Sequence, residues 1–309
     1  MTTVLQRYDT RAWLLFSAMA LLWGVPYLFI KVAVDSYSPV AIVSGRTLIG
    51  ALLLLPFALR HGALRPALAH WPWVLAFGAI EMAGPFLLLG HAEQTLPSGL
   101  TGLLVATVPL FAAVIAFTRG DRESLKPARV IGLAVGFVGV AIIVLGPGLG
   151  VDGGIGLVAI GEVLLVAVLY AIAPFIVARK LGAVPALGTV TISLAAVGLF
   201  YLPVVLLTPQ PTPTLEGTVA VVLLGVLCTA VAFIAFFALI ARVGPVRAPL
   251  FTYVNPIVAI ALGVIVLGEE LTPALLIGFP IVLAGCWLAA TGGIRMRRPP
   301  AGIPPIAPG

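Results

Sequence analysis

Long apolar runs separated by short polar connections dominate the sequence. An α-helix needs roughly 20 apolar residues to cross a bilayer, and each run has about that length. Proline begins several of the runs, as in Ser38-Pro39, Lys126-Pro127 and Thr272-Pro273, where its missing N–H removes no helical hydrogen bond. The pattern predicts ten membrane-spanning helices, at residues 13–34, 39–59, 71–91, 97–117, 128–145, 155–178, 185–207, 218–241, 248–267 and 273–292.

The composition agrees with an all-α integral membrane protein. Of the 309 residues, 61% are hydrophobic and 9% are charged, whereas a soluble domain has about 25% charged residues. This excludes a water-soluble globule and leaves no room for a large extramembrane domain. Cys228 and Cys286 both lie inside apolar runs, so we expect no disulfide framework, no cysteine-ligated zinc site and no cysteine-held cluster. We expect no other metal site and no cofactor. The basic residues flank apolar runs instead of gathering on one face, which argues against nucleic acid as a partner.

The distribution of basic residues predicts the orientation. When successive connections are assigned to alternate sides, those on the N-terminal side carry 15 of the 17 Lys and Arg residues. The other two, Lys31 and Arg46, fall within predicted spans. Because basic connections stay in the cytoplasm, we expect a multi-pass protein of the cytoplasmic membrane with both termini inside the cell. The first span lacks the pattern of a cleaved signal peptide.

An internal repeat divides the chain. Residues 123–132 (ESLKPARVIG) match residues 269–278 (EELTPALLIG) at Glu, Leu, Pro, Ala, Ile and Gly, and the same offset of 146 relates Gly139 to Gly285. Each half contains five spans, an odd number, so the halves must enter the membrane from opposite sides as inverted repeats. We expect repeats at 1–146 and 147–294 and a disordered cytoplasmic tail at 295–309. Such halves can rock about a site between them, although a duplicated scaffold without transport activity has the same pattern.

Two features inside the spans bear on helix packing. Gly132 and Gly136 form a GxxxG pattern, which predicts a close helix contact within the monomer, with a homodimer interface as the alternative. Prolines inside spans remove a backbone hydrogen bond and predict kinks or interruptions, unless the helices simply tolerate them. These are Pro26, Pro85, Pro109, Pro174, Pro256 and Pro280.

Three segments resemble EamA-type members of the drug/metabolite transporter superfamily. They are LLWGVPYLFIKVAV, SPVAIVSGRTLIGALLLL and VNPIVAIALGVIVLGEELTPALLIGFPIVLAGCWL, and the resemblance covers nearly the whole chain. It implies ten spans in two five-helix repeats, and a carrier that often exports amino acids, other metabolites or toxic compounds. It also implies a central cavity between the halves, but it does not identify the substrate.

Charged residues within the spans are the first candidates for the substrate pathway, because a charge at mid-bilayer costs about 2.5 kcal/mol or more. We predict that Arg46 either pairs with Glu81 or binds an anionic group of the substrate, and the alternative is a permanent structural ion pair. Desolvation of Glu81 makes it a candidate for proton exchange during transport. Lys31, whose ammonium can reach the headgroups, and Glu162 are read as structural.

Aromatic and polar residues near helix breaks complete the candidate pathway. Trp23 and Tyr170 correspond at an offset of 147, as expected for residues on either side of a cavity between inverted halves. Ordinary helix packing is the alternative explanation for any one of these aromatic residues. The remaining candidates for the pathway are Tyr27, Phe233, Phe237, Tyr253 and Asn255.

Three further polar residues lie near span ends. We expect Glu269 and Glu270, in the connection before the last span, to be solvated and to mark the start of a helix, not a metal site. His91 ends the third predicted span and is read as an ordinary interfacial histidine.

These features favour a secondary carrier that exports a small metabolite, amino acid or drug-like compound. A passive channel and a lipid-linked flippase subunit stay as alternatives. An intramembrane enzyme is disfavoured because the chain has three histidines, no paired His ligands in a span and no GxSxG motif. We expect a small-molecule substrate and the lipid bilayer as partners, and proton coupling and a homodimer are left open.

Overall fold

Ten apolar segments of the computed structural model are long enough to cross a membrane. The structure describes residues 10–120, 126–146, 154–244 and 248–291, so the predicted tail lies outside the described residues. The ten segments, here called spans 1 to 10, match the predicted runs to within three residues at each end. They are Thr10–Ala33, Pro39–Arg60, Trp71–Ala92, Ser98–Thr118, Pro127–Leu145, Gly156–Leu181, Ala186–Leu207, Leu215–Val243, Ala248–Leu267 and Pro273–Thr291.

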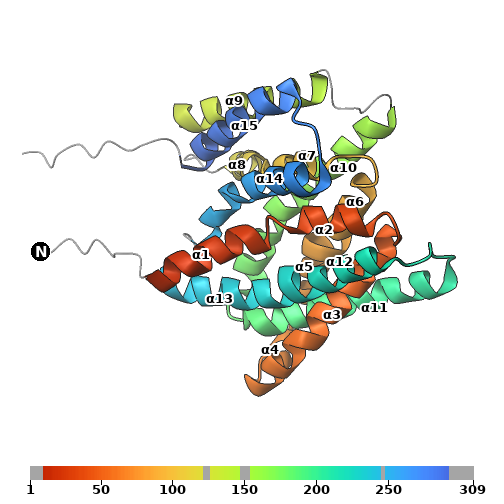
Figure 1. The fold of residues 1–309 in the computed structure, drawn as a ribbon. Helices are drawn as coiled ribbons and strands as arrows, with labels where there is room; N and C mark the ends of the chain where they lie inside the picture. The colour runs from red at the N-terminus through yellow and green to blue at the C-terminus, as the bar shows by residue number, and fades with distance from the viewer. Residues whose placement is uncertain (1–9, 121–125, 147–153, 245–247, 292–309) are drawn as a thin grey trace, which may run out of the picture.

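Several spans consist of more than one helical element (Figure 1). In chain order the described elements are α1 (Thr10–Leu22), α2 (Pro26–Ala33), α3 (Pro39–Arg60), α4 (Leu64–Ala69), α5 (Trp71–Gly78), η1 (Ala79–Ala83), α6 (Gly84–Ala92), α7 (Ser98–Val105), α8 (Val108–Thr118), α9 (Pro127–Leu145), α10 (Gly154–Ile176), η3 (Val177–Leu181), α11 (Ala186–Leu207), α12 (Leu215–Gly225), η4 (Val226–Val231), α13 (Ala232–Val243), η5 (Ala248–Tyr253), α14 (Asn255–Leu267) and α15 (Pro273–Thr291). Since successive spans run in alternate directions, Thr10 and Thr291 lie at the same face, here called the terminal face. The other is the opposite face.

Four of the six prolines predicted to disturb a span lie at an irregularity. Pro26, Pro109 and Pro256 each stand in the first turn of a new helix, just after a break in spans 1, 4 and 9. Pro85 follows the π-helix η1 in span 3. Each of these helices is interrupted because proline has no N–H for the helical hydrogen bond and its ring clashes with the preceding turn.

At the other two prolines the helix is not interrupted, and the prediction of a kink there stays a prediction. Helix α10 continues through Pro174, and α15 continues through Pro280. A spanning helix can absorb the loss of a single hydrogen bond when neighbouring helices hold it in place. Conversely, the π-helix η4 interrupts span 8 at Val226–Val231, where no proline predicts it.

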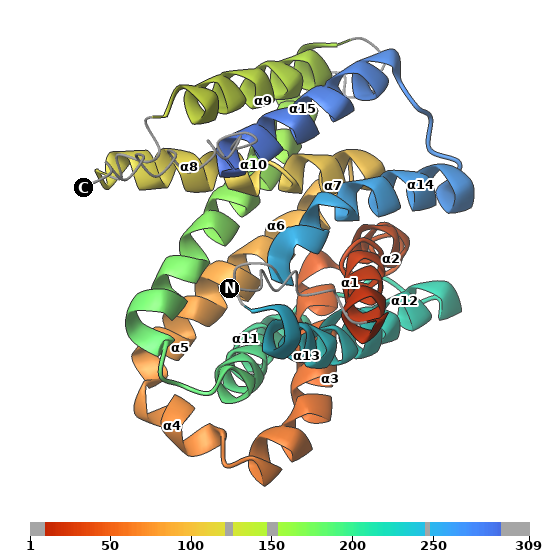
Figure 2. The same cartoon turned by 90° about the vertical axis from the view of Figure 1, so that its left-hand side faces the viewer.

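The packing of the spans is unchanged when the two halves are exchanged. Span 2 packs on span 7, span 4 on span 9 and span 5 on span 10, and each of these pairs maps onto itself when the halves are interchanged. Span 1 packs on span 8, and span 6 packs correspondingly on span 3. Figures 1 and 2 show α9 and α15 side by side along one edge of the molecule, and α3 beside α11 toward the other. The two halves are therefore related by a pseudo-two-fold axis.

The contact between α9 and α15 locates this axis at the level of residues. A Cβ on Gly139 would lie 2.8 Å from the backbone nitrogen of Val282, and a Cβ on Gly285 would overlap the backbone nitrogen of Gly136. Adding 146 to 139 gives 285, and subtracting 146 from 282 gives 136, so the two contacts are images of each other. Because α9 and α15 run antiparallel, the axis is perpendicular to the helices and lies in the membrane plane. This confirms the inverted repeat, and the GxxxG glycines make their contact within the monomer.

Gly285→Ala is expected to destabilise the protein. The added methyl group would press on the α9 backbone, and overpacking of this kind costs about 1–3 kcal/mol. The measurement is thermal unfolding of the purified protein in detergent. Gly161→Ala in α10 is the matched control, because its added Cβ would meet nothing within 4 Å. Equal melting temperatures for the two variants would contradict the α9–α15 contact.

Candidate transport site

Arg46 lies near the start of α3, and its side chain points into the bundle. The residue is 5% exposed, and its guanidinium carbon lies 3.9 Å from the centre of the Phe86 ring on α6. Its Nε has no hydrogen-bond partner. Because buried guanidinium groups normally donate to carboxylates or carbonyls, this nitrogen is a donor that a bound ligand could use.

Both halves of the chain contribute the surroundings of Arg46. Tyr27 on α2, Tyr170 on α10, Cys228 in η4 and Glu93 after α6 all lie within electrostatic range of its guanidinium. Elements α2, α3 and α6 belong to the first half, whereas α10 and η4 belong to the second. The group is here called the Arg46 site and consists of Tyr27, Arg46, Phe86, Glu93 and Tyr170. It lies at the interface of the two halves, where a rocking motion would change its exposure.

Arg46 and Glu81 form no ion pair in this structure. No carboxylate oxygen of the described chain lies within 4.0 Å of an Arg46 nitrogen. Glu81 belongs to the π-helix η1 and is half-buried. Tyr170 lies within electrostatic range of both charges and links them indirectly. The permanent ion pair is therefore not the role of Arg46 here, and a binding role stays a prediction.

Glu93 is a candidate that the sequence reasoning missed. It lies one residue beyond span 3, in a connection where carboxylates are usually solvated, yet it is 0% exposed and neither carboxylate oxygen has a hydrogen-bond partner. Burial raises the pKa of this carboxyl group well above its usual value. The Glu269 carboxylate adds to this rise, whereas Lys31 and Arg46 oppose it. Its one sequence signal is a spacing of seven residues, two helical turns, from Phe86.

Lys31 holds the end of α6 at the opposite face. Its Nζ donates to the carbonyl oxygen of Glu93 at 2.7 Å and to that of Leu96 at 3.0 Å. These carbonyls follow the last turn of α6, where helical partners are lacking. The expectation of a structural lysine agrees with this contact, in which the ammonium reaches the connection beyond span 3.

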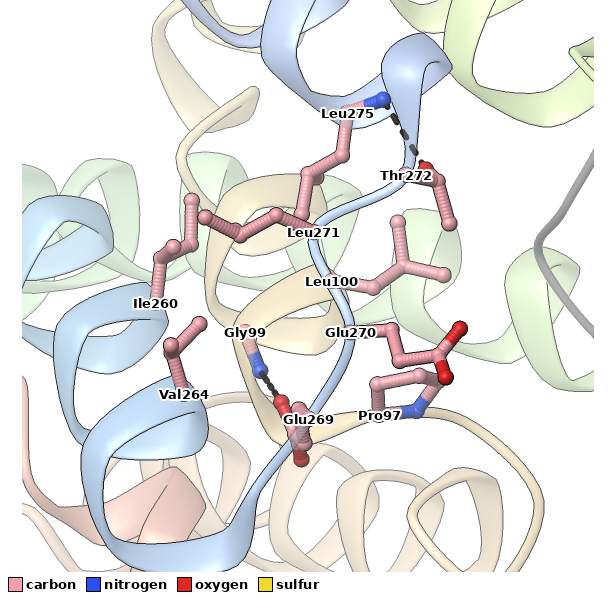
Figure 3. A pocket seen from close by; sticks show the side chains of 10 residues that line it. All are labelled: Pro97, Gly99, Leu100, Ile260, Val264, Glu269, Glu270, Leu271, Thr272 and Leu275. Carbon is pink, nitrogen blue, oxygen red and sulfur yellow. Dashed lines mark hydrogen bonds between the residues drawn. The ribbon is translucent and has the colours of Figure 1, made fainter.

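Glu269 caps a helix of the other half. Its carboxylate accepts a hydrogen bond from the backbone N–H of Ser98 at 2.6 Å, at the start of α7. It accepts a second from the backbone N–H of Gly99 at 3.0 Å (Figure 3). The carboxylate thus meets two N–H groups that have no partner within the helix, at the positive end of its dipole. The expectation of a solvated Glu269 is wrong, whereas Glu270 is exposed. This connection between the halves at the opposite face is here called the Glu269 clasp.

A pocket of about 220 Å³ lies beside the clasp, between the start of α7 and helix α14 (Figure 3). Apolar side chains line most of it, and Glu269 and Glu270 form part of its wall. The described part of the chain contains no group of three or more His, Cys, Asp or Glu residues that could hold a metal ion.

The predicted aromatic residues do not form one group. The Trp23 ring packs against Phe233, Phe236 and Phe251, with ring centres 5.8, 5.0 and 5.4 Å away. Tyr170 instead packs against the core cluster that contains Tyr27. The pair related by symmetry therefore lies in two different clusters, and the structure places Tyr170, but not Trp23, beside Arg46.

The other predicted polar and aromatic residues have packing roles that are visible in the structure. Phe233 and Phe237 stack along one face of α13, with ring centres 6.0 Å apart. Tyr253 packs against the same core cluster as Tyr170. With its amide oriented to suit its surroundings, the Asn255 nitrogen lies 3.2 Å from the carbonyl oxygens of Ala20 and Phe251, and so joins the breaks in spans 1 and 9.

His91 and Glu162 link two helices of the different halves. The Nδ1 atom of His91 on α6 lies 2.8 Å from a carboxylate oxygen of Glu162 on α10. This agrees with the structural reading of Glu162.

Known proteins resemble this chain over nearly its whole length. The sequence model of the EamA-like transporter family matches residues 10–145 and again residues 156–291. The uncharacterized inner membrane transporter YedA of Escherichia coli (strain K12) is 28% identical over 293 residues, 94% of each chain. A probable terminal-alkyne amino-acid exporter of Streptantibioticus cattleyicolor is 26% identical and covers 89% of this chain and 92% of its own. A solved crystal structure that is 24% identical shares the fold, with a TM-score of 0.63 over 90% of this chain and 96% of that one.

Proposed function

Because the chain belongs to the EamA-like transporter family, we propose that it is a secondary active transporter that exports a small metabolite by alternating access. The observation that carries the proposal is the Arg46 site: a buried guanidinium with an unpartnered Nε, at the interface of two inverted halves. Inverted halves interconvert inward-open and outward-open states when they exchange conformations. A site between them is then exposed to one side at a time.

The proposed orientation places both termini in the cytoplasm. The connections at the terminal face, together with the span ends that border them, carry 15 of the 17 basic residues, and such basic segments are retained on the cytoplasmic side. The opposite face, with the Glu269 clasp, is then the outer face. Export corresponds to loading of the Arg46 site from the terminal face and release at the clasp.

The proposed substrate carries an anionic group. Arg46 offers a buried donor to it, and the Phe86 ring holds the guanidinium plane from one side. A relative named as an amino-acid exporter supports a carboxylate-bearing substrate. The relatives are named as transporters, and we propose no enzymatic activity for this chain.

Arg46→Ala is expected to reduce substrate counterflow in proteoliposomes by about tenfold or more, because a charge-assisted hydrogen bond contributes about 1.5–3 kcal/mol. Arg46→Lys keeps the charge but loses the planar donor set, and we expect an intermediate rate. Arg60→Ala, at the exposed end of the same helix, is the matched control and should transport at the normal rate. Near-normal counterflow by a well-folded Arg46→Ala protein would rule out the binding role.

A further inference from the structure

Two buried groups of opposite chemistry lie within electrostatic range of each other, and each has polar atoms without a hydrogen-bond partner. Arg46 Nε is a donor without an acceptor, and both carboxylate oxygens of Glu93 are acceptors without a donor. The two residues are 5% and 0% exposed. They lie within electrostatic range of each other, yet no nitrogen of Arg46 comes within 4.0 Å of a Glu93 oxygen. The protein therefore holds a buried cation and a buried acid within electrostatic range of each other without a direct ion pair.

The neighbouring charges do not satisfy Glu93, because each has other partners. The Lys31 ammonium donates to the carbonyl oxygens of Glu93 and Leu96. The Glu269 carboxylate accepts from Ser98 and Gly99. Leaving a buried polar group unpartnered costs about 1–3 kcal/mol, and more when the group is charged. Such a cost at two adjacent groups is typical of a site that is completed by a ligand.

We propose that Arg46 and Glu93 together bind a zwitterionic amino acid, with its carboxylate on the guanidinium and its ammonium on the Glu93 carboxylate. This inference rests on the proposed function and specifies its substrate class. An amino acid supplies the missing acceptor and the missing donors in one molecule. Phe86 lies against the Arg46 guanidinium, and Tyr27 and Tyr170 lie within electrostatic range of it, so the faces of these rings are available to an apolar side chain.

The same arrangement couples binding to a proton. The titratable groups near Glu93 are Lys31, Arg46, Tyr27 and Glu269, and burial raises the pKa of its carboxyl group well above the usual value against the two cations. The proposed empty site therefore holds the protonated acid. An ammonium group binds the ionised carboxylate, so the Glu93 O–H bond breaks and one proton is released as the amino acid binds. Proton and substrate therefore compete for Glu93. That competition is what exchange of an amino acid for a proton across the membrane requires.

The test compares an amino acid with its two singly charged analogues. The purified protein is first screened by thermal stabilisation with the twenty proteinogenic L-amino acids. The tightest ligand is then compared with its methyl ester, which keeps only the ammonium, and with its deaminated acid, which keeps only the carboxylate. For the wild type we expect each analogue to bind about tenfold or more weakly, the loss of one charge-assisted contact.

Two variants assign each charge to its residue. Glu93→Gln should bind the deaminated acid as tightly as the amino acid, but should still bind the amino acid more tightly than its methyl ester. Arg46→Gln should bind the methyl ester as tightly as the amino acid, but should still bind the amino acid more tightly than the deaminated acid. If Glu93 and Arg46 had purely structural roles, the two variants would not each lose selectivity against a different analogue. Glu93→Asp and Arg46→Lys should restore part of each preference, and both Glu270→Gln and Arg60→Gln, at exposed positions, should keep the wild-type order.

Three results would overturn the proposal. The first is that no amino acid stabilises the wild type, and the second is that an analogue binds the wild type as tightly as the amino acid does. The third is that Glu93→Gln and Arg46→Gln both fold and both keep the wild-type order of affinities for the amino acid and its analogues. Counterflow of sugars, nucleosides and cationic drugs is measured in parallel. If one of these solutes exchanges and no amino acid does, the proposed transport function is supported and the amino-acid site at Arg46 and Glu93 is rejected. If neither these solutes nor any amino acid exchanges, the proposed transport function itself is rejected.

Discussion

Glu269→Ala is expected to raise the population that is open at the opposite face by about tenfold or more, because hydrogen bonds to a charged group contribute about 1.5–3 kcal/mol and 1.4 kcal/mol is a factor of ten. The two bonds to Ser98 and Gly99 join the connection between spans 9 and 10 to the start of span 4, so they tie one half to the other. Without the carboxylate, the first N–H groups of α7 have no side-chain acceptor. Opening of this face lets water replace it, which favours the open state.

Cysteine accessibility measures this opening. Leu100 lines the pocket beside the clasp and is 1% exposed, so a cysteine substituted there should react slowly with a membrane-impermeant maleimide. The native Cys228 and Cys286, both buried, are first replaced by alanine. Glu269→Ala should speed the labelling of position 100, and Glu270→Ala, the exposed neighbour, should not. Unchanged labelling in the Glu269→Ala background would show that the contact does not hold this face closed.

Amino-acid affinity is expected to depend strongly on pH through Glu93. Burial holds the pKa of this carboxyl group well above its usual value in the empty site, and the bound ammonium requires the ionised form. Affinity should therefore fall by up to about tenfold for each pH unit below the raised pKa, and become constant above it. The loss occurs as pH decreases, because protonation competes with the substrate.

Glu93→Gln should abolish both this pH dependence and the release of a proton on binding, which a pH-sensitive dye detects in weakly buffered solution. Glu81→Gln is the informative comparison, because Glu81 is the carboxylate that sequence reasoning selects for proton exchange. If the pH dependence disappears with Glu81→Gln and persists with Glu93→Gln, the proton site is Glu81 and the assignment to Glu93 is wrong.

Much of the fold could be predicted from the sequence because the bilayer imposes simple rules. Hydrocarbon thickness determines the length of an apolar run, so the sequence predicts all ten spans to within three residues at each end. The offset of 146 identified the duplication, and the same offset relates the contacts of Gly139 and Gly285 in the structure. Arg46 was found because a charge inside an apolar run is conspicuous.

The rest depends on contacts between distant segments. Glu93 lies one residue outside a span, and only the packing of the surrounding helices buries it. Glu269 looked like a solvated residue because its partners, Ser98 and Gly99, are about 170 residues away. Whether a proline breaks its helix also depends on neighbours, as the difference between Pro26 and Pro280 shows. Local patterns do not contain this information.

Counterflow through the wild-type protein tests most directly whether one site serves both faces in turn. Proteoliposomes are loaded with the unlabelled amino acid that stabilises the protein most, and entry of the labelled amino acid is followed at increasing outside concentrations. Alternating access predicts saturable entry that is accelerated by unlabelled amino acid inside. Entry that rises linearly with concentration and is indifferent to the internal amino acid would contradict it and indicate a passive channel.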